Sequence, residues 1–131
     1  MKAIPLRLKP RQDLRLGIEN FCVENDIHSA CILTCVGSLT TAALRMAGAS
    51  EIIQRDGPFE IISLVGTISK DGVHFHSALS DANGVVWGGH VAKGCIVYTT
   101  AEIILGVLED YTFTREHDAQ TQYPELKITK N

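Results

Sequence analysis

The sequence predicts an α+β fold, a mostly antiparallel β-sheet flanked by one main helix. Three observations lead to this fold class. Only residues 10–25 repeat apolar side chains convincingly at helical spacing. From Ser29 onward the chain is rich in apolar and β-branched runs separated by turn residues. No repeat, linker or low-complexity tract interrupts the 131 residues, so we expect one domain spanning residues 1–131.

The composition is that of a soluble globular protein, with 45% hydrophobic and 21% charged residues. No apolar run approaches the roughly 18 to 20 residues that a membrane-spanning helix needs, so no membrane partner is expected. The N-terminus is interrupted by Pro5, Arg7 and Pro10, which is unlike the apolar segment of a signal peptide. We therefore expect a cytoplasmic protein.

The cysteines agree with a reducing compartment. All four lie in apolar stretches and show no paired framework: Cys22, Cys31, Cys35 and Cys95. They are interpreted as small buried hydrophobic residues. Cys31 and Cys35 share one face of a predicted strand, so a shared metal ion is an alternative for that pair.

The first element is an edge strand over residues 2–9, where side chains alternate and Pro5 is tolerated. Pro10 closes this strand and opens the helix. The helix has an apolar face with Arg15 and Glu19 on the other side. That apolar face consists of Leu14, Ile18, Phe21 and Cys22. Asn25 and Asp26 are its expected end.

The following segments are expected to be strands. Residues 30–36 and 40–46 form two apolar runs separated by Gly37, residues 54–57 resemble a turn, and residues 59–69 form a long strand. Thr99 and Glu102 have capping-box spacing, but the β-branched density of residues 96–104 favours a strand. Because one helix cannot cover every apolar face of such a sheet, an oligomer is expected.

The most informative segment is a predicted hairpin over residues 72–90. A three-residue loop at residues 82–84, with Gly84 in the left-handed conformation, places His76 opposite His90. A two-residue loop at Asn83 and Gly84 would send His90 to the other face. The three-residue register is adopted because it separates an apolar face from a histidine face. The apolar face holds Val73, Phe75, Leu79, Trp87 and Val91.

The histidine face predicts a metal site formed by His74, His76 and His90. Neighbouring positions on one face bring Cβ atoms to about 5 Å, and three imidazoles can then close on one ion at roughly 2.0–2.1 Å. Nitrogen ligands favour zinc, with copper, nickel and iron more compatible than calcium or magnesium. His28 and His117 lack such neighbours and are interpreted as surface residues.

These residues carry a family resemblance. The pattern Gly-x-His-x-His-x-x-Leu-Ser-Asp-x-x-Gly-x-x-x-Gly-Gly-His over residues 72–90 resembles the signature of stand-alone prokaryotic proteins of the plants-and-prokaryotes conserved (PPC) domain family. Residues 57–62 resemble the Gly-Arg-Phe-Glu-Ile-Leu core of plant members, and residues 100–102, 113–118 and 125–126 also fit. The resemblance implies an antiparallel sheet with helical cover, a homotrimer, and zinc bound by the three histidines.

The family is commonly labelled as predicted DNA-binding, a label that in plants belongs largely to fused AT-hook segments. This chain has no Arg-Gly-Arg-Pro hook, and Pro58 replaces the arginine of the plant core. A net charge of −3 also disfavours nucleic acid. Residues 1–16, however, hold five basic groups against one acidic group, so any DNA contact is expected there.

Two main functions follow. The favoured one is a trimeric binding or regulatory module whose zinc is structural or senses an unknown small ligand. The alternative is a zinc-dependent enzyme that uses a metal-activated water on an unknown small substrate. That enzyme needs a general base, for which Glu102 and Glu60 are the candidates. A scaffold that binds metal incidentally is a third hypothesis.

Overall fold

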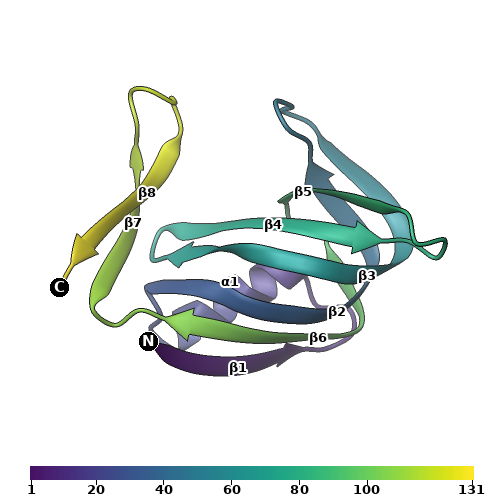
Figure 1. Ribbon diagram of the computed structural model, residues 1–131, viewed down its shortest axis with the longest axis horizontal. Helices are drawn as coiled ribbons and strands as arrows, with labels where there is room; N and C mark the ends of the chain where they lie inside the picture. The colour runs from purple at the N-terminus through teal and green to yellow at the C-terminus, as the bar shows by residue number, and fades with distance from the viewer.

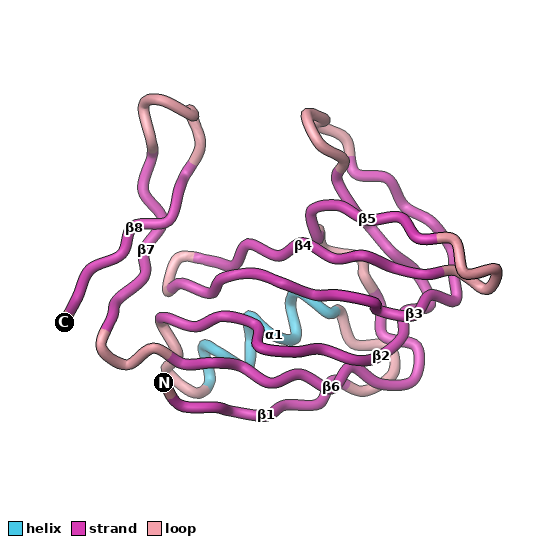
Figure 2. Tube along the Cα trace, in the orientation of Figure 1, coloured by secondary structure: helices cyan, strands magenta, loops and turns pink.

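The computed structural model describes residues 1–131 and confirms the predicted α+β fold (Figure 1). One helix accompanies eight strands, as the colouring of Figure 2 shows. In chain order the elements are β1 (Lys2–Leu8), α1 (Leu14–Glu24), β2 (Ser29–Arg45), β3 (Ile52–Ser69), β4 (Gly72–Ser80), β5 (Val86–Val91), β6 (Ile96–Val107), β7 (Tyr111–His117) and β8 (Pro124–Lys130). The structure contains no helix that could span a membrane.

Six strands form one antiparallel sheet in the order β1-β6-β2-β3-β4-β5, and β7 and β8 form a separate two-stranded sheet. β1 is an edge strand, as predicted from Pro5. Figure 1 shows the β7–β8 hairpin projecting beyond one end of the large sheet. The expected strand over residues 96–104 is confirmed as part of β6, so the capping-box spacing of Thr99 and Glu102 does not start a helix.

β2 and β3 are the longest strands, and their far ends bend toward β5. Leu44 and Arg45 of β2 pair with Val91 and His90 of β5. This additional pairing closes β2, β3, β4 and β5 into a ring. The closure brings His90 beside a strand that lies about 45 residues earlier in the chain.

Three predicted boundaries were wrong. Residues 54–57 lie inside β3, where Gln54, Arg55 and Asp56 pair with β2. The turn lies instead at residues 46–51, where Gly48 has the left-handed φ of 69°. Residues 30–36 and 40–46 belong to one strand, because Gly37 at φ 159° is extended rather than a break. The helix begins at Leu14, not directly after Pro10.

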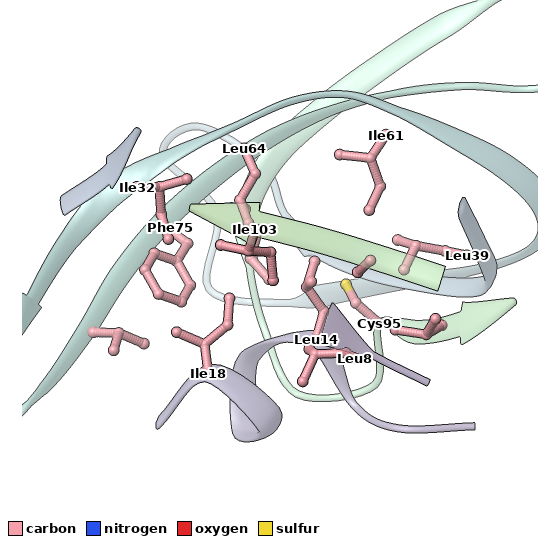
Figure 3. Packing of buried hydrophobic residues seen from close by; sticks show 14 of the residues in the cluster. Leu8, Leu14, Ile18, Ile32, Leu39, Ile61, Leu64, Phe75, Cys95 and Ile103 are labelled. Atoms are coloured by element: carbon pink, nitrogen blue, oxygen red, sulfur yellow. The ribbon is translucent and has the colours of Figure 1, made fainter. Parts of the chain in front are cut away.

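The core lies between α1 and the sheet. The apolar face of α1 is buried through Leu14, Ile18 and Cys22. Figure 3 shows Leu14 and Ile18 pointing toward the strands that carry Phe75 and Ile103, and all four of these side chains are at most 1% exposed. Each such burial stabilises the fold by about 1.5–3 kcal/mol relative to an exposed side chain.

A bulge in β2 separates Cys31 from Cys35. Cys31 pairs with Gly106, whereas Cys35 pairs with Ile103, and the register shifts between Ile32 and Thr34. The extra residue turns the two cysteines to opposite faces of the sheet, so the alternative of a metal shared by this pair was wrong. Cys35 packs against the core, and burial raises the pKa of its thiol to about 12.

The face of the sheet opposite α1 is only partly covered. Four apolar side chains on it are 45–60% exposed: Leu33, Val36, Ile62 and Val65. The expectation that one helix leaves apolar sheet surface exposed is therefore confirmed. We refer to these four residues as the outer apolar face.

Asp13 couples the start of α1 to the loop before β6. Its Oδ1 accepts a hydrogen bond from the Leu16 amide at 2.9 Å, and its Oδ2 accepts one from the Gly94 amide at 2.7 Å. We predict that Asp13→Ala lowers the free energy of unfolding by about 2 kcal/mol, because the helix cap and the loop contact are both lost.

Urea denaturation measures this change, and Asp13→Asn is expected to be intermediate because it keeps one acceptor oxygen. Glu24→Ala, at an exposed position in the same helix, is the control. Equal stability of Asp13→Ala and Glu24→Ala would contradict the assigned role.

Candidate metal centre

The turn between β4 and β5 adopts the predicted three-residue loop. The Asp81 amide donates to the Val85 carbonyl at 2.9 Å, and the Gly84 amide donates to the Asp81 carbonyl at 3.0 Å. The Asp81 side chain also accepts from the amides of Asn83 and Val85, both at 2.9 Å. Gly84 has φ 78°, the left-handed value that this loop requires.

This loop sets the register of the hairpin, in which His76 lies directly opposite His90. The face division is confirmed, because Val73, Phe75, Leu79 and Val91 are buried on the core side. The three histidines lie on the other face, where His74 and His76 are exposed and His90 is half-buried.

The three imidazoles converge. One nitrogen from each of His74, His76 and His90 lies within 4.8 Å of the other two, and the Nε2 atoms of His74 and His76 are 3.1 Å apart. Two nitrogens bound at 2.0–2.1 Å to a tetrahedral ion are about 3.3 Å apart. The spacing therefore suits a metal ion, and this group could hold one.

Two glycines let β5 approach its neighbours on both sides. A Cβ atom on Gly88 would lie 2.6 Å from the Ser77 carbonyl oxygen, and one on Gly89 would lie 2.7 Å from the Arg45 carbonyl oxygen. Any larger residue would push β5 away from β4 or β2. The Gly-Gly pair before His90 thus serves close backbone approach.

The surroundings lower the pKa of two of the imidazoles. Burial lowers the pKa of His90 to about 4, and the positive charge of Arg45 and the neighbouring His74 act in the same direction. Burial and His76 lower the pKa of His74. His90 and His74 are therefore neutral at pH 7, the form that binds metal. The buried Nδ1 of His90 has no hydrogen-bond partner within the protein.

Three arginines that the sequence analysis did not assign to the site lie around it. Arg45 sits opposite His90 across the β2–β5 pair.

Arg115 of β7 lies near the His74 side of the group. Its Nη2 donates to Thr67 Oγ1 at 2.9 Å, and Thr67 is opposite His74. Arg15 of α1 donates to the carbonyls of Val91 and Val73 at 3.0 and 3.5 Å, each next to a site histidine. Contacts between elements far apart in the chain bring these arginines near the histidines, and no local sequence motif indicates such contacts.

The structure does not bring Glu102 or Glu60 to the histidines. Glu102 lies on β6, three strand positions from β4, which corresponds to about 14 Å. Glu60 pairs with Ser80, four residues from His76, or about 13 Å along the strand. His28 pairs with Asp26 at 2.8 Å on the surface and, like His117, does not join the group.

Fold and site together define a class: a β-rich α+β protein that displays three histidines from one hairpin on the face of its sheet opposite the helix. The family model described as the Plants and Prokaryotes Conserved (PCC) domain matches residues 1–109. The chain belongs to this family, the same PPC family that its histidine motif resembles.

Relatives and solved structures agree with this assignment. The chain is 43% identical over 130 residues to a protein named Bifunctional protein GlmU from Synechococcus sp. strain JA-3-3Ab, covering 99% of this chain but only 21% of that protein. The chain thus spans about a fifth of this curated relative. A hypothetical protein from Salmonella is 42% identical with a TM-score of 0.96, covering 99% of this chain and 94% of that one.

Two more distant structures bear on the site and the fold. The metal-containing protein AF0104 from Archaeoglobus fulgidus is 28% identical with a TM-score of 0.80, covering 97% of this chain and 94% of that one. A protein from Bacteroides thetaiotaomicron, described as a DNA-binding candidate, is 16% identical with a TM-score of 0.83 and covers 98% and 91% of the two chains. The latter likeness concerns the fold alone.

The lowered pKa of His90 predicts a pH-dependent stability of the metal-free protein. Because the folded pKa is about 4 and the ordinary value is 6.5, the unfolded chain binds more protons between these values. Stability should therefore fall as the pH drops from 6.5 toward 4.

Urea denaturation in EDTA at several pH values measures this slope. His90→Gln removes one of the two histidines whose pKa is lowered and should make the curve less steep within this window. His117→Gln, at an exposed histidine outside the group, is the control. A wild-type slope in His90→Gln would contradict the assignment.

Proposed function

We propose that this chain is a metal-dependent binding or regulatory module, one domain over residues 1–131, in which His74, His76 and His90 hold a zinc ion. The observation that carries the proposal is the convergence of three imidazole nitrogens within 4.8 Å. An all-nitrogen ligand set favours zinc over hard cations such as calcium and magnesium. The name of the Archaeoglobus relative, a metal-containing protein, supports a metal in this fold.

The geometry favours ligand binding at the metal. Three protein ligands leave a fourth position on a tetrahedral zinc ion, and the exposure of His74 and His76 leaves it accessible from solvent. Zinc enzymes use such a position for an activated water. That alternative needs a general base, and the positions of Glu102 and Glu60 described above do not supply one. Glu125 of β8 comes closer, since its charge acts on both His74 and Arg115, but a neighbouring guanidinium weakens a carboxylate as a base. We therefore favour a sensing or binding role.

We further propose that the module is a homotrimer. The outer apolar face exposes Leu33, Val36, Ile62 and Val65, and apolar side chains exposed together on one sheet face are typical of association sites. A cyclic assembly would cover this face in every copy. The family resemblance described for the sequence implies the same state.

DNA is a weaker candidate partner. The Bacteroides neighbour is described as a DNA-binding candidate, and the N-terminal segment is locally basic. However, the Arg15 guanidinium of that segment already donates hydrogen bonds to Glu19 and to the Val91 carbonyl, and Arg7 donates to Thr100. These donors are therefore less available to phosphate groups. The net charge of −3 opposes phosphate binding. The proposal therefore rests on the metal and not on DNA.

We predict that protein purified without a histidine tag contains about one equivalent of zinc per chain, and that His76→Ala loses it. Elemental analysis by mass spectrometry measures the metal content. His117→Ala is the matched control, since His117 lies outside the group. Equal metal in His76→Ala and wild type, with unchanged circular dichroism, would remove the site.

The trimer is tested by static light scattering. Val36→Glu places a charge on the outer apolar face and is expected to give monomers, because desolvating a carboxylate there is costly. Val23→Glu is the control, since Val23 is 80% exposed on α1, on the opposite side of the sheet. A monomeric wild-type protein would contradict the proposed assembly.

A further inference from the structure

Two guanidinium groups flank the three histidines, one at each side. Arg45 on β2 lies directly opposite His90. Arg115 on β7 reaches the other side of the group, where it donates to Thr67, the residue opposite His74. The two arginines come from elements far apart in the chain, and both are half-buried. Their charges therefore act in a medium less polar than water.

Neither arginine is neutralised by a carboxylate. The three ion pairs of the chain are Arg15–Glu19, His28–Asp26 and Lys127–Glu116. The guanidinium of Arg45 makes one hydrogen bond, from Nη1 to the Ala49 carbonyl at 3.0 Å. That of Arg115 also makes one, to Thr67. A guanidinium offers five N–H donors, so most donors of both groups remain available.

The nearby carboxylates do not neutralise the two guanidinium groups. Glu125 of β8 is close enough for its charge to act on both His74 and Arg115, but it forms no ion pair with Arg115. Neutral imidazoles leave the two positive charges of a bound zinc ion uncompensated. A second carboxylate, that of Asp71, accepts a hydrogen bond from the Arg115 backbone amide at 3.0 Å. The four positive charges of zinc and two guanidinium groups outweigh these two carboxylates, so the site has an excess of positive charge.

We infer that the ligand of this site is a small oxyanion, a molecule that carries a carboxylate or phosphate group, recognised by Arg115 and Arg45. Guanidinium groups match both anions through paired N–H donors, and zinc accepts oxygen ligands at its open position. This inference rests on the proposed metal site and specifies which class of molecule the module binds.

Each arginine also has a simpler structural role. Arg115 joins the β7–β8 hairpin to β3, and Arg45 steadies the turn after β2 through Ala49. A purely structural role predicts that substitutions change stability and leave anion affinity intact. The test must therefore read out anion binding separately from folding and from metal binding.

The experiment uses tag-free protein loaded with Co²⁺, whose visible absorption reports the ligands of the ion. Inorganic phosphate and acetate are titrated as probes at constant ionic strength. We expect saturable changes in the Co²⁺ spectrum, and we expect Arg115→Gln and Arg45→Gln each to weaken anion binding by about tenfold, the loss expected for a charge-assisted hydrogen bond. The affinity for Co²⁺ itself should change little.

Arg11→Gln is the matched control, since Arg11 is exposed in the turn before α1. Tighter binding of phosphate than of acetate would identify a phosphate-bearing ligand, and the reverse order a carboxylate. Metal-free protein should bind both probes more weakly, as calorimetry can show.

The outcomes separate this inference from the proposed function. Absence of Co²⁺ binding would remove the metal site itself, and this inference with it. If the protein binds Co²⁺ but phosphate and acetate leave its spectrum unchanged, the inference of an oxyanion ligand is wrong and the metal site stands. Equal anion affinities in wild type, Arg115→Gln and Arg45→Gln would also overturn the oxyanion inference.

Discussion

The histidine site depends on the register of one hairpin. The loop from Asp81 to Val85 sets this register through the Asp81 side chain, which accepts two amide hydrogen bonds, and the left-handed Gly84. A slip of one residue would turn His90 toward the core and expose the buried face of β5. The burial of Phe75, Leu79 and Val91 therefore stabilises the same arrangement that brings the imidazoles together.

A second constraint is the pairing of β5, the strand that carries His90, with two neighbouring strands. β5 pairs with β4 on one side and with the end of β2 on the other, and the absence of side chains at Gly88 and Gly89 permits this approach. Where β4 and β5 separate, the Arg15 guanidinium donates to a carbonyl of each strand. The strands that carry the histidines are thus held on both sides, which reduces the conformational entropy lost when a metal binds.

The sequence predicted what local patterns control. The loop residues Asn83 and Gly84 allowed two registers of the hairpin. The period of two along its strands decided between them, because only one register separates an apolar face from a histidine face. Pairing between distant parts of the chain determined the features that the sequence analysis missed or predicted wrongly. Gln54–Gly57 has turn-forming residues, yet pairing with β2 extends β3 through them. The bulge in β2 that separates the cysteines, and the approach of Arg115 to Thr67 across 48 positions, leave no local signal.

X-ray absorption spectroscopy of the zinc-loaded protein tests the central claim most directly, because it measures the atoms bound to the ion. The account predicts three imidazole nitrogens at about 2.0–2.1 Å, one further light atom and no sulfur. A zinc–sulfur shell at about 2.3 Å, or fewer than three imidazoles, would contradict it.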